Sequence, residues 1–595
     1  QAVIQHAQGR TGDQKPVMGV RGFRQFAPDG HIDPVVKPHL QRIQQVTKPV
    51  RIIGELVTNF QAPVMIDLQN SEAEARHGAL ALDGAGERWR ASAGRGRWSW
   101  LAPISSSLTT RRELTHPSSP LPPRRSLGEE IVDRLGRSER RLVAPVHVLL
   151  DERGDALTSR CWLGLDPIGA YARSHSVGAV DQVAEFAASI ADTHPNVVAC
   201  TIDTTRYVDA GADEVQEIAW MLATGVAMLR SLEAAGLPVE RAAATIGFRV
   251  AADADQFLTI ARLRAARSLW GSVLAACGVD THPSRFHAVT SPAMFSRRDA
   301  AVNMLRSTSA AFGAGVGGAD SVTVLPFDGS DSTLARRNAR NIHHLLIEES
   351  GVNRLVDPAA GSGFVESLTD RLCEAAWSTF QQVEADGGMV VALESGAVET
   401  AIDAAWSARL ERLATRKEPV TGVSEFPDDA PGAVIPEPVD GFPVRRPAAP
   451  FETLRDAADG ARETGGSPAV HLAALGSLAD HTARSTWITN FLAVGGLDAI
   501  GGDADGAASA ADAVAAFEQA GASVAVLCSS DPVYAELAVP AATELKAAGA
   551  DFVALAGHPG ERRDELAAAG VDAFFHVGVD VLAALTDLHE RLGVR

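Results

Sequence analysis

Short apolar runs alternate with longer amphipathic segments from about residue 144 to residue 418. The runs read APVHVLLD, CWLGLDPIG, VVACTID, ATIGFRVAAD, FHAVTS and DSVTVLPFD. Between two of them, residues 214–235 repeat apolar side chains at helical spacing: Ile218, Leu222, Val226, Leu229 and Leu232. This alternation predicts a parallel β-sheet with crossover helices. We expect a (β/α)8 TIM-like barrel over residues 126–418, of which roughly six of the eight required units are visible.

The alternation restarts over residues 467–595, where apolar runs read AVHLAAL, LDAIGG, SVAVLCSS, DFVALAG and FFHVG. Five short parallel strands in about 130 residues is the size of a flavodoxin-like (Rossmann-like) doubly wound α/β domain. The intervening residues 419–466 are rich in proline, at Pro427, Pro431, Pro436, Pro438, Pro443, Pro447 and Pro450. This composition predicts a stiff, extended linker in place of a packed element.

Residues 1–125 show the least regular pattern. Two apolar runs there, Val50 to Leu56 and Pro63 to Leu68, each have the composition of a strand and could supply the missing barrel strands. Half a barrel, a wrapping arm and a wrong gene start are all compatible with this region, to which we assign no function. Because the chain begins with Gln1, we expect its start to be processed or misassigned.

Composition restricts the class of protein. The 595-residue chain is 46% hydrophobic and carries a net charge of −20. An acidic surface repels phosphates, so we expect neither a nucleic-acid partner nor binding to anionic membranes. An anionic ligand such as a CoA ester would therefore require a local basic patch.

The five cysteines form no CxxC pair, so we expect neither a disulfide framework nor a zinc or other metal site. No apolar span reaches the ~18 residues of a transmembrane helix, and the N-terminus lacks the pattern of a signal peptide. These features predict a cytoplasmic protein.

Linear motifs connect the chain to a known family. The stretches at residues 209–237 (DAGADEVQEIAWMLATG…), 248–273, 297–328, 334–377 and 416–427 resemble the methylmalonyl-CoA mutase family closely and in family order. Residues 475–502 (LGSLADHTARSTWITN…) then resemble the cobalamin-binding domain of that family. The resemblance implies the rearrangement of methylmalonyl-CoA to succinyl-CoA by radicals generated from adenosylcobalamin.

Several positions depart from the pattern of a cobalamin-binding domain. In the family, an Asp-x-His-x-x-Gly motif supplies the histidine ligand of cobalt, with the Asp accepting its other N–H. The matching positions here keep His481 but replace the Asp with Ala479 and the Gly with Arg484. Downstream, Asp531 follows Cys528–Ser529–Ser530 where an apolar residue is expected, and one glycine of a Gly-Gly pair is Ala556, before Gly557. We therefore treat His481 as a degenerate cofactor position, and a capping or surface histidine as the plainer alternative.

The predicted barrel departs from the family in the same direction. A catalytic Tyr-His pair corresponds here to Thr205 and Arg206, and the nearby Tyr207 is out of register by two residues. An acyl-gripping Arg-Thr-His-Ser-Gln-Thr-Ser segment reads RFHAVTS over residues 285–291 and keeps only part of its polar set. We place His287 at the end of a predicted strand, which makes it a weak catalytic candidate, and a satisfied structural histidine is the preferred interpretation.

Two further patterns admit a ligand. The glycines Gly313, Gly315, Gly317 and Gly318 could form a phosphate loop, but no Lys-Ser/Thr follows them, so close helix–strand packing is preferred. Two groups of arginines, Arg262, Arg264 and Arg267 and then Arg336, Arg337 and Arg340, could contact a CoA phosphate. Solvated helix faces or partner-facing ion pairs are the preferred interpretation of both groups.

An intact framework with altered ligand positions predicts the small, non-catalytic subunit of a heterodimeric mutase. On this hypothesis a large catalytic subunit binds adenosylcobalamin and the acyl-CoA, and this chain stabilises it. Two alternatives remain open: a divergent acyl-CoA mutase or barrel enzyme that is active alone, and a gene product damaged at its start.

Overall fold

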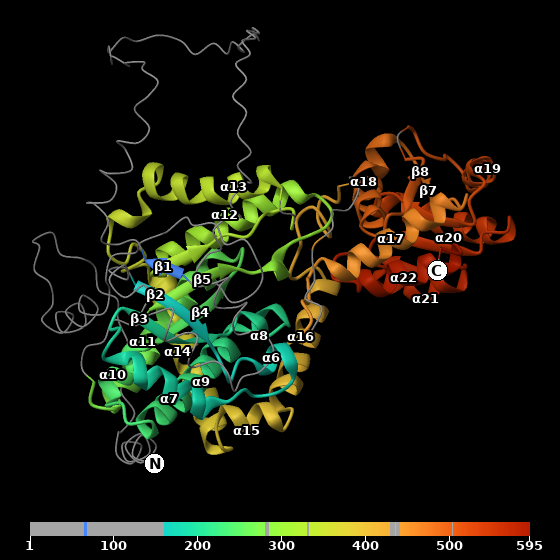
Figure 1. Ribbon diagram of the computed structural model, residues 1–595. Helices are drawn as coiled ribbons and strands as arrows, with labels where there is room; N and C mark the ends of the chain where they lie inside the picture. The colour runs from blue at the N-terminus through green and yellow to red at the C-terminus, as the bar shows by residue number, and fades with distance from the viewer. Residues whose placement is uncertain are drawn as a thin grey trace, which may run out of the picture. The chain divides into compact units, whose positions relative to one another are not determined.

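The computed structural model describes residues 160–279, 285–329, 332–428, 441–502 and 504–594, together with Met65–Asp67 and Ile435 (Figure 1). The chain forms two compact units. The smaller unit contains β1 (Met65–Asp67) and most of β2 (Arg160–Leu165). These strands pair antiparallel, with Met65 opposite Trp162, and β1 falls within one of the two N-terminal runs predicted to be strands. The runs at residues 50–56 and 144–151 lie outside the described residues.

The first sheet of the larger unit contains four parallel strands that pair in chain order. They are β3 (Val197–Asp203), β4 (Ile246–Ala252), β5 (Phe286–Thr290) and β6 (Ser321–Thr323). The helices that connect them are α8 (Thr205–Asp209), α9 (Glu214–Ala234), α10 (Val239–Ala244), α11 (Gln256–Ala276), η4 (Pro292–Met294) and α12 (Ala300–Val316). The parallel β-helix-β arrangement predicted from the apolar runs is confirmed here.

Other helices precede and follow this sheet. They are α6 (Tyr171–Ser174), α7 (Val180–Ala191), α13 (Thr333–His344), η5 (Leu345–Glu349), η6 (Val352–Arg354), α14 (Gly363–Ala385), α15 (Met389–Glu394) and α16 (Ala397–Ala414). Helix α14 packs on both α9 and α11. The sheet is thereby covered by helices, as a largely apolar parallel sheet requires.

Helix α9 shows why these segments are helical. The Asp213 carboxylate accepts a hydrogen bond from the Gln216 N–H (2.8 Å), and the Gln216 side chain accepts one from the Asp213 N–H (3.0 Å). This reciprocal capping box satisfies N–H groups that have no partner inside the helix. The predicted apolar face is buried, since no side chain from Ile218 to Leu232 on that face is more than 4% exposed.

A buried ion pair joins α9 and α11 to the sheet. Glu217 is 1% exposed and Arg262 is 3% exposed, and Arg262 Nη1 lies 3.0 Å from Glu217 Oε2. Glu217 Oε1 accepts hydrogen bonds from the Thr204 hydroxyl and the Ala251 N–H, both at 2.9 Å, while Arg262 Nη2 donates to the Ala251 carbonyl at 2.6 Å. One carboxylate therefore connects α9, α11, β4 and the turn after β3.

The glycines of α12 have a packing role that differs in detail from the prediction. A Cβ atom on Gly313 would lie 3.1 Å from the Gln256 carbonyl oxygen, and one on Gly317 would lie 3.0 Å from the Ile260 Cα. Both neighbours belong to α11, so the glycines permit close approach of two helices. The predicted tight turn is present at Gly317 and Gly318, between α12 and β6, where Gly318 has a φ of 91°. Gly313 and Gly315 instead lie inside α12, and the close packing is between two helices, not between a helix and a strand.

The second sheet contains five parallel strands in the order β8-β7-β9-β10-β11. They are β7 (Ala469–Ala474), β8 (Asp498–Ile500), β9 (Val524–Cys528), β10 (Phe552–Ala556) and β11 (Ala573–Phe575). The associated helices are α18 (Leu478–Val494), α19 (Ala510–Ala520), α20 (Asp531–Ala547), η7 (Gly560–Arg562), α21 (Arg563–Ala568) and α22 (Val581–Arg591). Every strand overlaps one of the predicted apolar runs, and buried cores lie on both faces.

Part of the proline-rich stretch is packed, which the sequence did not predict. Helix α17 (Ala449–Glu463) lies within it, and Phe451 and Leu454 belong to a core of the second sheet. Phe442 is 4% exposed and contacts the ring of Tyr207, with centroids 5.9 Å apart. A proline at the first turn of α17 explains the difference, because that position needs no N–H donor.

We expect Arg262→Met to lower the free energy of unfolding by ~3–5 kcal/mol, since it leaves the Glu217 carboxylate buried without its counter-ion. Adding Glu217→Gln should recover part of that loss, because the amide oxygen can still accept from Thr204 and Ala251. Urea denaturation followed by tryptophan fluorescence measures both variants. Arg371→Met, at an exposed position on α14, is the control; an Arg262 variant no less stable than this control would contradict the assignment.

Candidate functional site

The carboxyl ends of the strands in the second sheet form the first candidate site. Ser477 precedes α18 just after β7, Ser529 and Ser530 follow β9, and Gly557 follows β10. In open parallel α/β sheets, ligands bind outside the carboxyl ends of the strands, where the strand order reverses. That reversal occurs here between β7 and β9, next to the first turns of α18. The two departures from the family motif, Ala479 and Arg484, lie on this helix.

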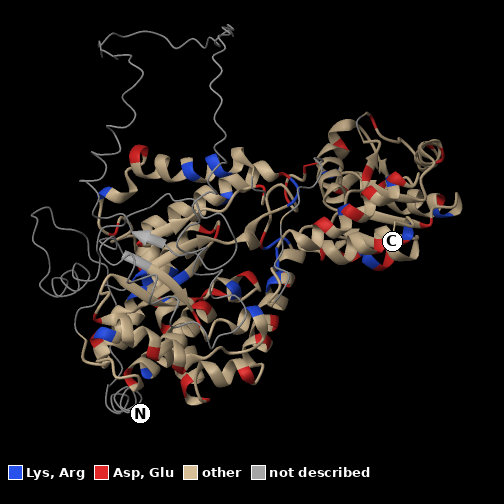
Figure 2. Ribbon diagram, in the orientation of Figure 1, with Lys and Arg blue, Asp and Glu red and all other residues tan. Residues whose placement is uncertain are grey.

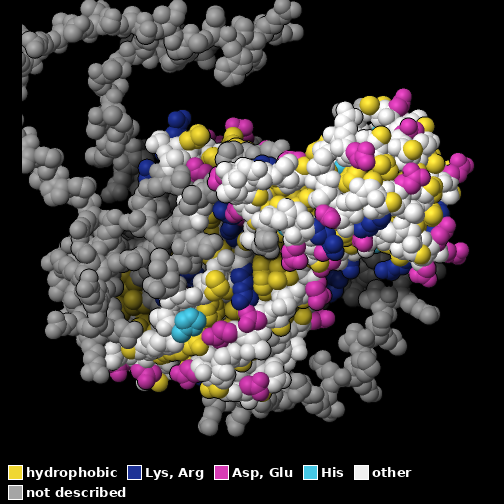
Figure 3. All heavy atoms as spheres, turned by 90° about the vertical axis from the view of Figure 1, so that its right-hand side faces the viewer, with side chains coloured by type: hydrophobic (Ala, Val, Ile, Leu, Met, Phe, Trp, Pro, Cys, Tyr) yellow, Lys and Arg dark blue, Asp and Glu magenta, His cyan; other side chains and the backbone are white. Residues whose placement is uncertain are grey.

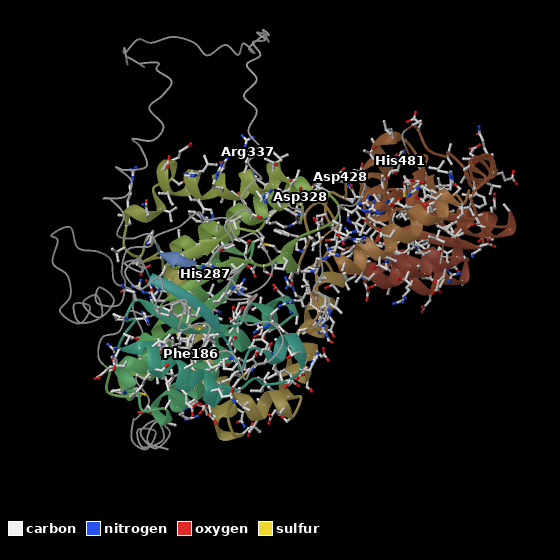
Figure 4. The ribbon with its side chains drawn as sticks, in the orientation of Figure 1. Phe186, His287, Asp328, Arg337, Asp428 and His481 are labelled. Carbon is white, nitrogen blue, oxygen red and sulfur yellow. The ribbon has the colours of Figure 1, made fainter. Side chains whose placement is uncertain are left out.

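His481 lies on α18 and is fully buried (Figure 4). Its Nε2 lies 3.0 Å from the Ala504 carbonyl oxygen, and its Nδ1 lies 3.1 Å from the Ser485 hydroxyl oxygen. A carbonyl can only accept, so Nε2 carries the proton and Nδ1 accepts from Ser485. As placed, neither ring nitrogen is free to bind cobalt. The predicted alternative of a surface histidine is wrong, because the ring is enclosed by its own helix and the loop at Ala504.

Asp480, which directly precedes His481 in the sequence, hydrogen-bonds to the N-cap residue of α18. Asp480 Oδ2 accepts hydrogen bonds from the Ser477 hydroxyl (2.6 Å) and the Ser477 N–H (3.0 Å). These hydrogen bonds from Ser477 hold the pKa of Asp480 below its ordinary value. Asp480 therefore closes the first turn of α18, and Ala479 offers no carboxylate in its place.

Arg484 fills the space beside the ends of β9 and β10. Its guanidinium donates to the Ser529 carbonyl, pairs with the Asp531 carboxylate, and lies over the Tyr534 ring with Cζ 4.8 Å from the centroid. A Cβ atom on Gly557 would lie 3.3 Å from the Arg484 Cζ, so the guanidinium lies against the backbone there. The crevice is thus occupied by a side chain of the protein.

Tyr534 completes this cluster, and the sequence analysis missed it. Its hydroxyl lies 2.8 Å from the Leu527 carbonyl oxygen and 3.0 Å from the Ala556 carbonyl oxygen, across the ends of β9 and β10. Asp531 and Tyr534 are three residues apart on α20, so both face Arg484. This three-residue spacing in the sequence could have indicated that the two side chains share one face of a helix. The residues present therefore do not fit a cobalamin ligated through His481.

The second candidate site is His287 in the first sheet (Figure 4). It is the second residue of β5, so the predicted position at the end of a strand is wrong. Its Nδ1 lies 2.8 Å from the Ser321 hydroxyl oxygen, and its Nε2 lies 3.2 Å from the Thr323 hydroxyl oxygen. Burial, with a smaller contribution from the Arg249 guanidinium, lowers the pKa of His287 to about 3. The imidazole is therefore neutral at physiological pH and held at both nitrogens.

His287 belongs to a polar row that crosses the sheet. The strand register places Asp203, Arg249, His287 and Ser321 side by side on β3, β4, β5 and β6. Arg249 pairs with Asp203 at 2.9 Å, and His287 pairs with Ser321. Many polar groups of this row therefore bind one another through an ion pair and a hydrogen bond, without a ligand.

The positions that correspond to the catalytic Tyr-His pair serve local structure. Thr205 and Arg206 begin α8, and the Thr205 hydroxyl donates to the Asp203 carboxylate at 2.5 Å. Tyr207 lies on the same helix and not on a strand, 1% exposed, with its ring edge-on to Trp220 at a centroid distance of 5.5 Å. Burial raises the pKa of Tyr207. The tyrosine thus faces the core, and no Tyr-His pair is assembled here.

A buried carboxyl group, that of Asp209, lies near these positions. Asp209 accepts a hydrogen bond from the Ser291 hydroxyl at 2.5 Å, and burial raises the pKa of Asp209 to about 7. The Asp209 carbonyl also accepts from the Arg445 N–H at 2.8 Å. The carboxyl group thus joins α8 to the loop after β5, and the backbone carbonyl joins α8 to the proline-rich stretch, so both serve local structure.

The two groups of arginines have different surroundings. Arg262 pairs with Glu217, Arg264 with Asp357 and Glu366, and Arg267 with Asp320. All these partners are within the chain, so the prediction of a solvated or partner-facing surface is wrong for this group. In contrast, Arg337 and Arg340 on α13 are exposed.

Two general findings complete the description of the sites. Within the described ranges, no three His, Cys, Asp or Glu side chains are grouped as a metal ion would require. Among the helices of those same ranges, none has the length and apolar character needed to span a bilayer.

The fold and these contacts define an α/β protein with two parallel sheets, whose candidate sites are filled by its own side chains. The family profile described as methylmalonyl-CoA mutase matches residues 169–464. The small subunit of methylmalonyl-CoA mutase from Streptomyces virginiae is 48% identical over 452 residues, which are 73% of this chain and 70% of that relative. The chain belongs to the methylmalonyl-CoA mutase family.

Other relatives extend this comparison. The small subunit from Propionibacterium freudenreichii subsp. shermanii is 39% identical over 446 residues, which are 73% of this chain and 69% of that relative. The methylmalonyl-CoA mutase of Escherichia coli K12 is 32% identical over 290 residues, which are 47% of this chain and 40% of that relative. The similarity to proteins named as small subunits thus extends over more of the chain.

The lowered pKa of His287 makes a prediction about acid stability. In the unfolded chain a histidine titrates near 6.5, so as the pH falls below that value the unfolded state gains a proton that the folded state does not accept. We expect His287 to contribute a loss of stability of ~1.4 kcal/mol per pH unit toward pH 3. Asp209, with its raised pKa, opposes this trend between its unfolded pKa and about 7.

A comparison of His287→Asn with the wild type isolates the histidine, because Asp209 is common to both. Urea midpoints between pH 7.5 and 5 should fall less steeply in the variant. Equal slopes for both proteins would contradict the neutral, buried state of His287.

Proposed function

We propose that this chain is the small, non-catalytic subunit of an adenosylcobalamin-dependent methylmalonyl-CoA mutase. A larger subunit binds the cofactor and the acyl-CoA and converts methylmalonyl-CoA to succinyl-CoA, and this chain stabilises it in the cytoplasm. The strand order β8-β7-β9-β10-β11 supports a flavodoxin-like domain, because it is the 2-1-3-4-5 order of that fold. The four-stranded parallel sheet supports a TIM-like barrel before it.

The observation that carries the proposal is the position of Arg484. A cofactor entering at the carboxyl ends of β9 and β10 would have to displace a guanidinium that pairs with Asp531 and lies over Tyr534. His481 would also have to give up hydrogen bonds to Ser485 and Ala504. The carboxylate that would orient the histidine is also missing at Ala479, and losing such a partner of a metal ligand weakens metal binding by ~10–100-fold by itself.

The first sheet supports the same proposal. His287 is neutral and held at both ring nitrogens, and the positions of the catalytic Tyr-His pair are Thr205 and Arg206. These positions therefore lack the features with which the family's catalytic chains protonate and grip a thioester, which supports a non-catalytic role. What this chain contributes is binding to its partner.

Isolation of the tagged chain from its source organism is the direct test. We expect an equimolar, larger relative to accompany it, with cobalamin and mutase activity present only in the complex. Size-exclusion chromatography with absorbance at corrinoid wavelengths, followed by mass spectrometry, measures all three properties. A lone chain that retains stoichiometric cobalamin or turns over acyl-CoA would overturn the proposal and favour an independent enzyme.

Arg484→Ala tests the filled crevice. We expect the variant to lose ~1–3 kcal/mol of stability, because the Ser529 carbonyl and the Tyr534 ring lose their cationic partner. It should still retain no cobalamin after gel filtration, since His481 remains hydrogen-bonded. Arg563→Ala, at an exposed position on α21, is the matched control and should change stability little. Stoichiometric cobalamin binding by the Arg484 variant would show that His481 can still serve as a ligand.

A further inference from the structure

The outer face of α13 exposes large apolar side chains at both of its ends. It carries Leu334, which is 68% exposed, at one end, and Leu345, which is 47% exposed, directly after the other end. Between them Arg337 and Asn341 are also exposed, and the helical spacing of the four residues places them in one stripe. Arg340 is exposed at the flank of this stripe. The opposite face holds Ala335, Ala339 and Ile342 in the core.

The charge on α13 contrasts with that of the chain. The whole protein carries a net charge of −20, yet α13 contains three arginines and no Asp or Glu (Figure 2). No ion pair within the described residues involves Arg337 or Arg340, whereas Arg262, Arg264 and Arg267 are all paired. In Figure 4 the Arg337 side chain lies on the outer side of α13, and Figure 3 shows Asp and Glu side chains scattered over the face turned toward the viewer.

The end of α13 has an irregular geometry. Residues Leu345–Glu349 form a π-helical turn, in which the Ser350 N–H donates to the Leu345 carbonyl at 2.9 Å. Such single π-turns are rare and occur frequently at functional sites. Here the turn keeps Leu346 buried at 5% exposure, while Leu345 remains exposed at the end of the stripe.

We propose that this face of α13 (Leu334, Arg337, Arg340, Asn341 and Leu345) docks the larger mutase subunit. The partner surface that fits is apolar at two points, for the leucines, with carboxylates between them for the guanidinium groups. Arginine is enriched in interfaces because it combines an apolar stem with a planar donor group. This inference rests on the proposed function, which supplies the partner.

A second copy of this chain fits less well. Two molecules that each carry a net charge of −20 repel each other over their whole surfaces. In a symmetric dimer centred on α13, the same arginines would also face one another. The large subunit is therefore the occupant to which the proposal commits.

The experiment uses the complete chain and its large subunit, co-expressed or mixed after purification. Arg337→Glu with Arg340→Glu reverses the charge of this face of α13, and Leu334→Ser with Leu345→Ser removes the two apolar ends of the stripe. We expect each double variant to weaken the complex at least tenfold at physiological salt, measured by isothermal titration calorimetry. The wild-type affinity should fall with added NaCl, and the arginine variant should show a smaller salt dependence.

Arg371→Glu with Arg563→Glu, at exposed positions on α14 and α21, matches the charge change away from α13. This control should bind as the wild type does, and circular dichroism and thermal melting should show that every variant folds. Wild-type binding with unchanged affinity of both α13 variants would overturn the docking surface and leave the proposed function intact. Absence of wild-type binding would overturn both. Self-association of this chain that the α13 variants abolish would assign the surface to a second copy and overturn the inference.

Discussion

The first sheet depends on one buried carboxylate. Glu217 joins the turn after β3, strand β4 and helices α9 and α11, and Arg262 neutralises it where water cannot reach. A buried ion pair of this kind adds little net stability compared with apolar packing, but it is demanding in geometry. The surfaces of α9 and α11 can therefore vary, while the spacing of the two helices is set at this point. The polar row of β3 to β6 lies on the framework that the pair maintains.

The second sheet is closed by a different kind of contact. Arg484 pairs with the exposed Asp531 carboxylate, donates to the Ser529 carbonyl after β9 and lies against Gly557 after β10. In a chain that binds a ligand at the carboxyl ends of these strands, the crevice is open and its backbone N–H and C=O groups can hydrogen-bond to the ligand. Here the groups are satisfied from within. The family framework persists because its folding is separable from the chemistry of its sites.

The sequence predicted the elements well and the partners of individual side chains poorly. Strands β3 to β6 and β7 to β11 follow from apolar runs, and the buried face of α9 follows from its spacing. Helix α17 was missed because its prolines indicated a linker, although a proline in the first turn is compatible with a helix. The partners of Arg262 and His287 could not be predicted from the sequence. Glu217 is distant in sequence from Arg262, and Ser321 from His287, and only the fold brings each pair together.

The filled crevice has a consequence for how such a protein is maintained in a cell. A domain that folds around a bound vitamin gains stability in proportion to the logarithm of the free vitamin concentration, and loses it when the supply falls. On the proposed function, in which this chain binds no cobalamin, a domain closed by its own arginine and tyrosine shows no such linkage. Its abundance is then set by synthesis and by the proposed partner, and stays constant through cofactor starvation.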